Sequence, residues 1–120
     1  MARTLYERLG GAEGIARLVD DAVGAHLENP AVKPRFEHAR DIDHAKRMSV
    51  EFFCAGAGGP EIYTGRDMLT THRGMNISEQ EFLAVVDDIL GAMAKNQYGD
   101  TEKKDVLAIL YSLKGAIIRV

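Results

Sequence analysis

Apolar residues recur at intervals of three and four along most of the chain, which is the period of an amphipathic helix. Four such stripes follow one another, each with the small or polar residues that share its face. They consist of Ile15, Leu18, Val19, Ala22, Val23, His26 and Leu27; Ile42, Ala45, Met48, Ser49, Phe52 and Ala55; Phe82, Val85, Val86, Ile89, Leu90 and Met93; and Val106, Ile109, Leu110, Leu113 and Ile117. No stretch alternates strictly as a half-buried strand does. The pattern predicts an all-α fold with four main helices and a few short ones, in a single domain covering residues 1–120.

Turn and cap residues bound each predicted helix. The Asn-Pro pair at 29–30 ends the first helix, because proline disfavours a helical conformation in the residue before it. The Gly-Ala-Gly-Gly-Pro run at 56–60 ends the second. Ser78 and Glu81 have the spacing of a capping box before the third, and residues 99–101 supply the turn and N-cap of the fourth.

One segment does not fit a plain helical bundle. About twenty residues separate Gly56 from Ser78, with glycines at 56, 58, 59, 65 and 74. A long irregular segment in a compact domain is usually functional or mobile. Inside it, Met68 and His72 are four residues apart, which predicts a short helix that carries a single histidine. A second short helix is expected from Thr4 to Leu9.

Composition and charge narrow the classes of function. The 120 residues carry a net charge of -3, so there is no excess of positive charge to neutralise phosphates, and we expect neither a nucleic-acid nor a membrane partner. No apolar run approaches the ~20 residues that span a bilayer, and the first residues lack the apolar stretch of a signal peptide. We therefore expect a cytoplasmic protein. The single cysteine, Cys54, excludes a disulfide framework and is interpreted as a packed thiol.

The histidines are the candidate metal ligands. They are His26, His38, His44 and His72. None belongs to the His-Glu-x-x-His pattern of zinc hydrolases, and the His and Asp residues within 38–44 are interpreted as a solvated connector rather than a metal site. His26 lies on an apolar helix face and is interpreted as a buried, hydrogen-bonded residue. His72 is thus left as the histidine whose setting, a short helix between glycine-rich loops, is unusual.

Short motifs along the chain occur in a recognisable order. They are Leu5–Gly11 (LYERLGG), Pro34–Phe36 (PRF), Val50–Phe53 (VEFF), Gly58–Pro60 (GGP), Tyr63–Gly65 (YTG), and Met68–His72 followed by Gly74 and Ile77. Together they resemble the group I truncated haemoglobins, the short two-over-two α-helical globins, over nearly the whole chain. The resemblance implies a two-over-two helical sandwich, one haem b per chain, and His72 as the proximal ligand of the haem iron. Neutral imidazole is a good ligand for haem iron.

The resemblance also implies the remaining parts of the site. Phe36 would pack on the haem face, and Phe53, Met68, Ile77, Phe82, Val85 and Val86 would supply apolar walls. The haem propionates would need cations or hydroxyl groups, for which the candidates are Arg66, Arg47, Lys46 and Tyr63. The expected ligand is oxygen, with carbon monoxide and nitric oxide as further small gases.

The distal side departs from the family pattern. Val23 stands where the family usually has a tyrosine that hydrogen-bonds oxygen, and Ala45, Met48 and Ser49 stand where relatives often carry glutamine, histidine or lysine. Losing a hydrogen bond to a charged acceptor costs about 1.5–3 kcal/mol. An apolar distal pocket therefore predicts faster release of oxygen, and it does not support nitric oxide dioxygenase-type or peroxidase-type activity.

Three hypotheses remain for the function. The first is reversible gas binding at an iron whose sixth position is open or occupied by water. The second is a six-coordinate haem redox or sensor protein with Met48 or His44 on the iron; these two share a helix face, so at most one can bind it. The third, a haem-free interaction module, does not explain the glycine pairs around His72. We expect a binding or carrier protein rather than an enzyme, a monomer or weak dimer, and a reductase as a candidate partner.

Overall fold

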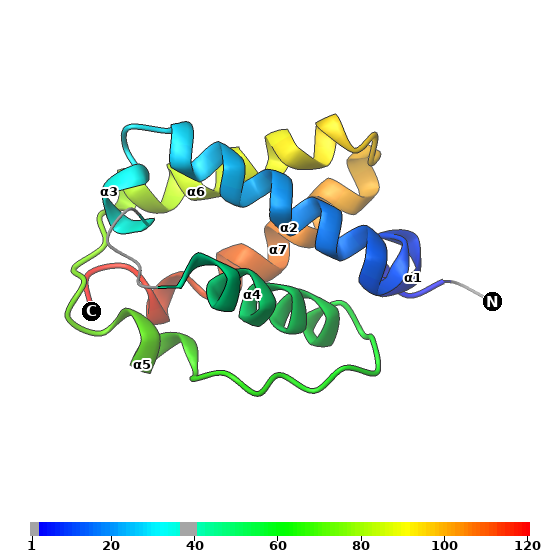
Figure 1. Ribbon diagram of the computed structural model, residues 1–120, viewed down its shortest axis with the longest axis horizontal. Coiled ribbons are helices and arrows are strands. Elements are labelled where there is room, and N and C mark those ends of the chain that lie inside the picture. The colour runs from blue at the N-terminus through cyan, green and yellow to red at the C-terminus, as the bar shows by residue number, and fades with distance from the viewer. Residues whose placement is uncertain (1–2, 37–40) are drawn as a thin grey trace.

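The computed structural model describes residues 3–36 and 41–120, and these residues form an all-helical structure (Figure 1). The helices are α1 (Leu5–Arg8), α2 (Gly11–Glu28), α3 (Lys33–Phe36), α4 (Ile42–Gly56), α5 (Met68–His72), α6 (Glu79–Lys95), α7 (Asp100–Ser112) and the 3₁₀ helix η1 (Lys114–Ala116). Within the described residues, the one β-type contact is an isolated parallel bridge between Ile77 and Ile118. The all-α prediction is confirmed. His38 lies outside the described residues.

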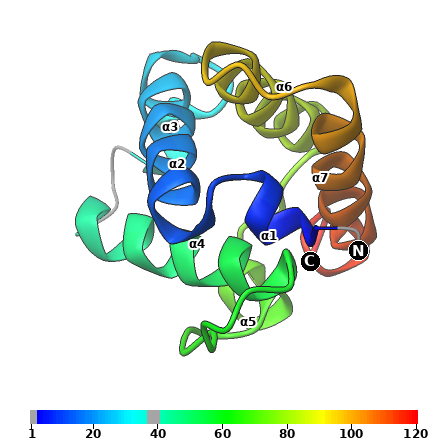
Figure 2. The ribbon, with the colours of Figure 1, turned by 90° about the vertical axis from the view of Figure 1, so that its right-hand side faces the viewer.

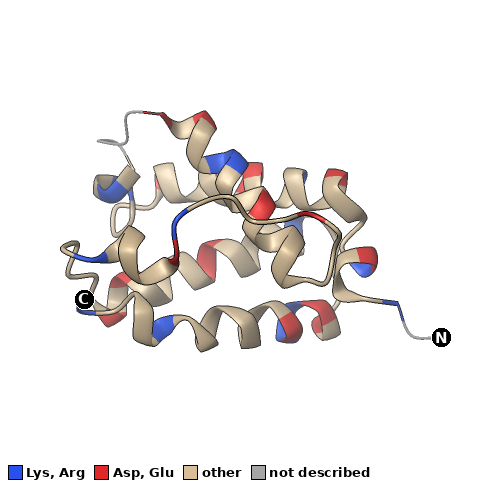
Figure 3. Cartoon of the chain, turned by 90° about the horizontal axis from the view of Figure 1, so that it is seen from below, with Lys and Arg blue, Asp and Glu red and all other residues tan. Residues whose placement is uncertain are grey.

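Helix α2 has two of the other long helices as its neighbours. This helix packs against α4 and α6, and α6 packs against α7. Viewed from the end of the molecule, α2, α4, α6 and α7 surround the interior, and α5 lies below α4 (Figure 2). Among the described residues, no helix has the length and apolar character needed to cross a membrane. Seen from below, acidic and basic residues are mixed over the helices rather than separated into faces of one sign (Figure 3).

Local capping explains where the helices start. Thr4 and Glu7 form a reciprocal capping box at α1, and Ser78 and Glu81 form one at α6. Each box satisfies backbone N–H groups that have no partner within the helix. Asp41 caps α4 by accepting from the backbone N–H of His44 at 2.9 Å. The capping box predicted before the third long helix is therefore confirmed, as is the end of α2 before Asn29.

The fourth long helix ends earlier than its apolar stripe predicts. α7 stops at Ser112, and the chain continues through the single turn of η1, so Leu113 and Ile117 lie outside α7. The backbone N–H of Leu113 donates to the Leu110 carbonyl three residues back, which is the tighter 3₁₀ pattern. The N-cap is Gly99, which has no side chain to cap the helix. The apolar stripe continues from α7 into η1 because side chains about one turn apart lie on the same face in both α-helices and 3₁₀ helices.

Most buried residues form one cluster, which we call the closed end. It consists of Leu9, Ile15, Leu18, Val19, Ala22, Val23, Cys54, Ala57, Ile89, Ala92, Met93 and Val106. Cys54 is fully buried, as predicted, and burial raises the pKa of its thiol to about 11. A second, smaller cluster contains Ile77, Phe82 and Val86, and with the cavity beside it forms what we call the cavity end.

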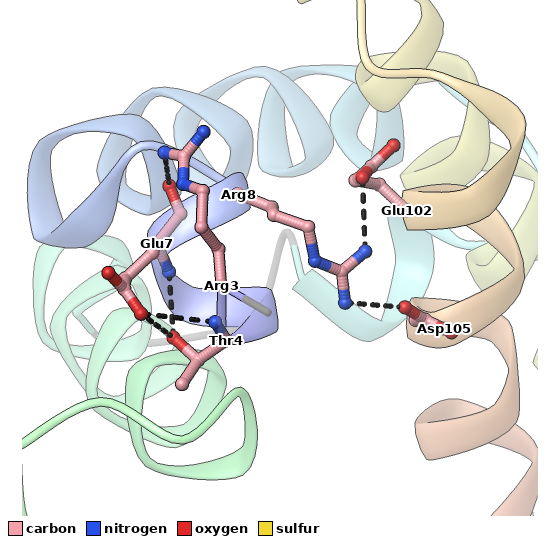
Figure 4. A network of polar contacts seen from close by, with 6 residues as sticks. All are labelled: Arg3, Thr4, Glu7, Arg8, Glu102 and Asp105. Carbon is pink, nitrogen blue, oxygen red and sulfur yellow. Dashed lines mark hydrogen bonds and ion pairs between the residues drawn. The ribbon is translucent and has the colours of Figure 1, made fainter. Parts of the chain in front are cut away.

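Close backbone contacts hold the first turns of the chain to the closed end. A Cβ on Gly14 would lie 2.0 Å from the Leu9 carbonyl oxygen, so no other residue fits there without a shift. The Tyr98 hydroxyl donates to the same Leu9 carbonyl. Arg8 joins α1 to α7 through ion pairs with Glu102 at 3.0 Å and Asp105 at 2.7 Å (Figure 4). Gly14 thus serves packing at the closed end.

Candidate functional site

A cavity of about 270 Å³ lies at the second buried cluster. Its walls come from α3, α5, α6, α7 and turns beside them, including the residues that flank η1, and most of the side chains are hydrophobic. The lining consists of Val32, Arg35, Phe36, Thr71, His72, Met75, Ile77, Glu81, Phe82, Val85, Val86, Leu110, Leu113 and Ile117. Among these described lining residues, His72 alone carries an imidazole nitrogen. Apolar walls with a few polar groups are typical of a site for a large, mostly apolar ligand.

His72 is held in one tautomer by its own helix. It is the last residue of α5, half-buried, and its Nδ1 lies 2.8 Å from the carbonyl oxygen of Met68. A carbonyl oxygen can only accept a hydrogen bond, so the proton of a neutral His72 lies on Nδ1. Nε2 is then left with its lone pair, which is the form of imidazole that binds a metal. A histidine that donates its other N–H to a backbone carbonyl is the usual arrangement at metal sites.

Hydrogen bonds fix the short helix α5 at its start and just after its end. The Asp67 carboxylate accepts from the backbone N–H of Thr70 at 2.8 Å, and hydrogen bonding to the side chain and backbone of Thr70 lowers the pKa of Asp67. Beyond His72, the backbone N–H groups of Gly74 and Asn76 donate to the Val120 carbonyl at 3.1 and 3.3 Å. Five residues are too few to form a stable helix alone. These contacts with α5 and its flanks therefore hold His72 in place.

The loop before α5 is tied to α1 and α4. The Tyr6 hydroxyl donates to Glu61 at 2.7 Å, which raises the pKa of Tyr6. The backbone N–H and the hydroxyl of Thr64 donate to the Glu51 carboxylate at 2.9 and 2.8 Å, and these bonds lower the pKa of Glu51. A Cβ on Gly59 would lie 2.4 Å from the Tyr6 ring. Gly59 thus lets the loop pass against Tyr6 on its way to α5.

An ion pair connects two sides of the cavity wall. Arg35 of α3 meets Glu81 of α6 with an Nε–Oε2 distance of 2.5 Å and an Nη2–Oε1 distance of 3.0 Å. The Arg35 guanidinium lowers the pKa of Glu81 to about 2, so this carboxylate stays ionised at neutral pH. The same side chain accepts from the backbone N–H of Ser78 at the start of α6. The pair joins α3 to the first turn of α6.

Phe36 lines the cavity from α3 and stacks on His26. The ring centroids are 5.2 Å apart and the ring planes differ by 18°. His26 is 5% exposed, and its Nδ1 lies 2.7 Å from Oδ2 of Asp88. The interpretation of His26 as a buried, hydrogen-bonded residue is confirmed.

Helix α4 presents an apolar stripe that the protein leaves half covered. Val50, Phe53 and Cys54 take part in the packing at the closed end, whereas Ala45 and Ser49, half-buried, belong to neither cluster. Met48 is also half-buried and also belongs to neither cluster. Figures 1 and 2 show α5 on the side of α4 that faces away from α2.

The structure brings only part of the predicted site to the cavity. Of the predicted residues, those that line it are Phe36, His72, Ile77, Phe82, Val85 and Val86. Those that lie elsewhere are Ala45, Met48 and Ser49 on α4, Phe53 beside the closed end, Val23 within it, and Met68, whose carbonyl accepts from His72. His44 is exposed in the first turn of α4, with its Nδ1 3.5 Å from Nη2 of Arg47.

The residues predicted to meet propionates do not line the cavity. Lys46 is paired with Asp20 of α2 at 2.7 Å. The Tyr63 hydroxyl donates to the Arg66 carbonyl at 2.6 Å, and the Arg66 side chain is exposed. Arg47 is exposed on α4. The partner of Lys46 is on another element, which a sequence pattern does not reveal.

Several lining residues were missed by the sequence reasoning. They are Val32, Arg35, Thr71, Met75, Glu81, Leu110, Leu113 and Ile117. Leu110, Leu113 and Ile117 lie on the predicted fourth stripe, and Thr71 and Met75 flank His72, so these had a usable signal. Val32 lies in a turn where no periodicity exists.

Residues 4–119 match the protein family described as bacterial-like globin. Over 115 residues, 96% of this chain and 97% of the relative, the sequence is 30% identical to the group 1 truncated haemoglobin GlbN of Nostoc sp. (strain MUN 8820). It is also 30% identical over 91 residues, 76% of this chain and 74% of the relative, to the group 1 truncated haemoglobin of Tetrahymena pyriformis.

Solved structures show the same fold. The crystal structure of the truncated haemoglobin from Tetrahymena pyriformis in its Fe(III) form superposes with a TM-score of 0.93 at 24% identity, covering 98% of this chain and 100% of that one. The group II truncated haemoglobin from Bacillus anthracis superposes with a TM-score of 0.88 at 22% identity, covering 100% and 94%. The predicted two-over-two helical architecture is confirmed.

Proposed function

Because the chain belongs to the bacterial-like globin family, we propose that it binds one haem b at the cavity through His72 and reversibly binds a small gas there. The observation that carries this proposal is the hydrogen bond from Nδ1 of His72 to the Met68 carbonyl. It leaves Nε2 as a ligand on a half-buried side chain that lines an apolar cavity. Bound haem supplies an iron centre at which oxygen, carbon monoxide or nitric oxide can bind.

The residues present fit a flat, largely apolar cofactor. On the cavity side, Phe36, Ile77, Phe82 and Val86 would cover it. On the other side, the half-covered stripe of α4 would supply Ala45, Met48 and Ser49. Burying apolar surface is worth roughly 25 cal/mol per Å². The cavity and the α4 stripe are therefore surfaces whose burial by haem stabilises the complex.

The charged edge of the cofactor would meet the loop before α5. Tyr63 and the exposed Arg66 lie in that loop, shortly before α5 begins at Met68. Lys46 is engaged with Asp20, so it must give up that ion pair before it can bind a propionate. The Tyr63 hydroxyl is engaged in the same way, because it donates to the Arg66 carbonyl. We therefore assign a propionate to Arg66 rather than to Lys46.

Of the four described residues assigned to the distal side, Val23, Ala45, Met48 and Ser49, only Ser49 would offer a bound gas a hydrogen-bond donor. Val23 is 6% exposed and packed within the closed end, and Ala45 and Met48 carry no donor. The loss of a hydrogen bond to a charged acceptor lowers affinity by roughly 10- to 100-fold. Oxygen should leave this protein correspondingly faster than it leaves a relative with a distal tyrosine.

A second candidate function is a six-coordinate haem redox or sensor protein. Met48 favours it, because this side chain lies half-buried on the stripe of α4 that the protein does not cover. His44 is a weaker candidate, since it is exposed in the first turn of α4 and its ring lies near Arg47. A low-spin ferrous spectrum that becomes high-spin in Met48→Ala would establish this second function.

A haem titration of wild type and His72→Gly tests the first proposal. Wild-type protein should take up one haem per chain and develop a Soret band. His72→Gly should bind haem more weakly, and free imidazole should restore the wild-type spectrum, because it replaces the lost ligand. A wild-type spectrum in His72→Gly without imidazole would exclude His72 as the ligand.

A further inference from the structure

A buried polar group that the proposed haem ligation does not use lies behind the cavity wall. His26 is 5% exposed and is the one polar or charged residue among those described that is classed with the buried core. A buried polar group costs free energy unless it is hydrogen-bonded. The contacts of the His26 ring must therefore compensate for the cost of burying it.

Two side chains fix the orientation of the His26 ring. Nδ1 lies 2.7 Å from Oδ2 of Asp88 on α6. Asn29 donates from Nδ2 to both oxygens of the same carboxylate, at 3.1 and 3.2 Å. An ionised carboxylate only accepts, so Nδ1 of His26 carries a proton toward Asp88. The imidazole plane is thereby held by α6 although the residue belongs to α2.

The His26 ring is the surface on which Phe36 rests. The two rings are stacked with centroids 5.2 Å apart, and Phe36 also lines the cavity. Phe36 is the last residue of α3, a helix of four residues that cannot hold a fixed geometry alone. Its neighbour Arg35 is attached to Glu81, which fixes the backbone of α3 but not the direction of the Phe36 ring. The Phe36 ring itself is in stacked contact with His26.

We propose that His26, supported by Asp88 and Asn29, is a positioning residue that sets the Phe36 ring against the haem. The inference rests on the proposed function, since it gives Phe36 a cofactor to contact. His26 itself touches neither haem nor gas in this account. It acts through Phe36, and a change at Asp88 reaches the cofactor by the same route.

Haem dissociation from a set of variants tests this order of action. His26→Leu removes the ring and the donor, and Asp88→Ala removes the support alone. Both should release haem about ten-fold faster than wild type, the factor that corresponds to one lost hydrogen bond. Asp88→Asn keeps an oxygen that can accept from His26, so it should stay close to wild type. Asp21→Ala is the matched control, because Asp21 also joins α2 to α6, through Lys95 and Asn96, but away from the cavity.

A double variant separates positioning from general destabilisation. If His26 acts through Phe36, His26→Leu combined with Phe36→Leu releases haem no faster than Phe36→Leu alone, because residues that act as one unit are not additive. Additive effects, or an equal effect of Asp21→Ala, would overturn the proposal.

Haem-free protein gives a readout that does not depend on the cofactor. The chain has four phenylalanines, so ¹³C-labelled phenylalanine yields a small set of ring signals. His26→Leu and Asp88→Ala should shift the Phe36 signal, and Asp21→Ala should not. Shifted Phe36 signals together with no haem uptake by wild type would refute the proposed function while showing the ring contact. Normal haem uptake with unmoved Phe36 signals would refute the positioning role alone.

Discussion

The two halves of α6 lie in different surroundings. Toward its C-terminal end, Ile89, Ala92 and Met93 are buried in the closed end. Toward its N-terminal end, Phe82 and Val86 are buried from water but line a cavity. The C-terminal half of α6 thus belongs to a core that is packed without a ligand. Its N-terminal half borders the cavity. This difference in packing separates the residues that stabilise the fold from those that line the cavity.

Two methionines should show the largest contrast between these regions. Met93 is fully buried in the closed end, whereas Met48 is half-buried on α4 outside both clusters. Met93→Ala should lower the free energy of unfolding by about 2–5 kcal/mol, the usual cost of emptying a packed methionine site. Met48→Ala should cost less than about 1 kcal/mol, as for a surface change. Urea denaturation of haem-free protein measures both, and equal losses would contradict the division.

Two glycines of α2 should respond with opposite signs. A Cβ on Gly14 would lie 2.0 Å from the Leu9 carbonyl oxygen, whereas one on Gly24 would meet nothing within 4 Å. Gly14→Ala should therefore destabilise the fold by about 3 kcal/mol through overpacking. Gly24→Ala should stabilise it by roughly 0.5–1 kcal/mol, because alanine is the better helix former. Chemical denaturation again provides the comparison, and a Gly14→Ala variant as stable as wild type would show that the close contact at Leu9 is not limiting.

Haem should stabilise the cavity end more than the closed end. At a free haem concentration of 100 times its dissociation constant, mass action adds about 2.7 kcal/mol to the stability. Hydrogen exchange should slow most in α5 and in the first half of α6, next to the cavity. Backbone amides around Met93 should already be protected without haem. A uniform gain in protection along α6 would remove the distinction between its halves.

The ion pair at the cavity wall should give a smaller, pH-dependent effect. The pKa of Glu81 is lowered from 4.5 to about 2, so the pair stabilises the folded state above pH 4.5. This contribution is lost as the pH falls from 4.5 toward 2, because the carboxylate then takes up a proton in the folded state also. Glu81→Gln removes the titration and should flatten the stability profile over this range, at a cost of about 1 kcal/mol near neutral pH. Asp20→Asn, at the exposed pair with Lys46, is the control for the loss of an ion pair away from the cavity.

Local signals in the sequence were sufficient for the start of α6 and the end of α2. Ser78 and Glu81 define the start of α6, and the Asn-Pro pair at 29–30 defines the end of α2, because capping depends on neighbouring residues. The end of α7 was predicted wrongly, since an apolar stripe continues into η1 without a break. The short helix that carries His72 was predicted from the spacing of Met68 and His72 alone.

Tertiary contacts were harder to anticipate. Lys46 was a candidate for a propionate, but it pairs with Asp20, which lies 26 residues away in the chain. Glu81 was predicted as a cap and is also the partner of Arg35, so a local pattern revealed only half of its role. Val32 lines the cavity from a turn that has no periodic pattern. Such roles depend on which elements meet, and no spacing within one helix encodes them.

The optical spectrum of the haem-loaded ferrous protein, with and without carbon monoxide, tests the central claim most directly. Haem held by His72 with an open sixth position predicts a five-coordinate high-spin ferrous spectrum. Carbon monoxide should convert it to a low-spin spectrum, and removal of the gas should reverse the change. A low-spin ferrous spectrum before carbon monoxide is added, or no spectral response to the gas, would contradict the account.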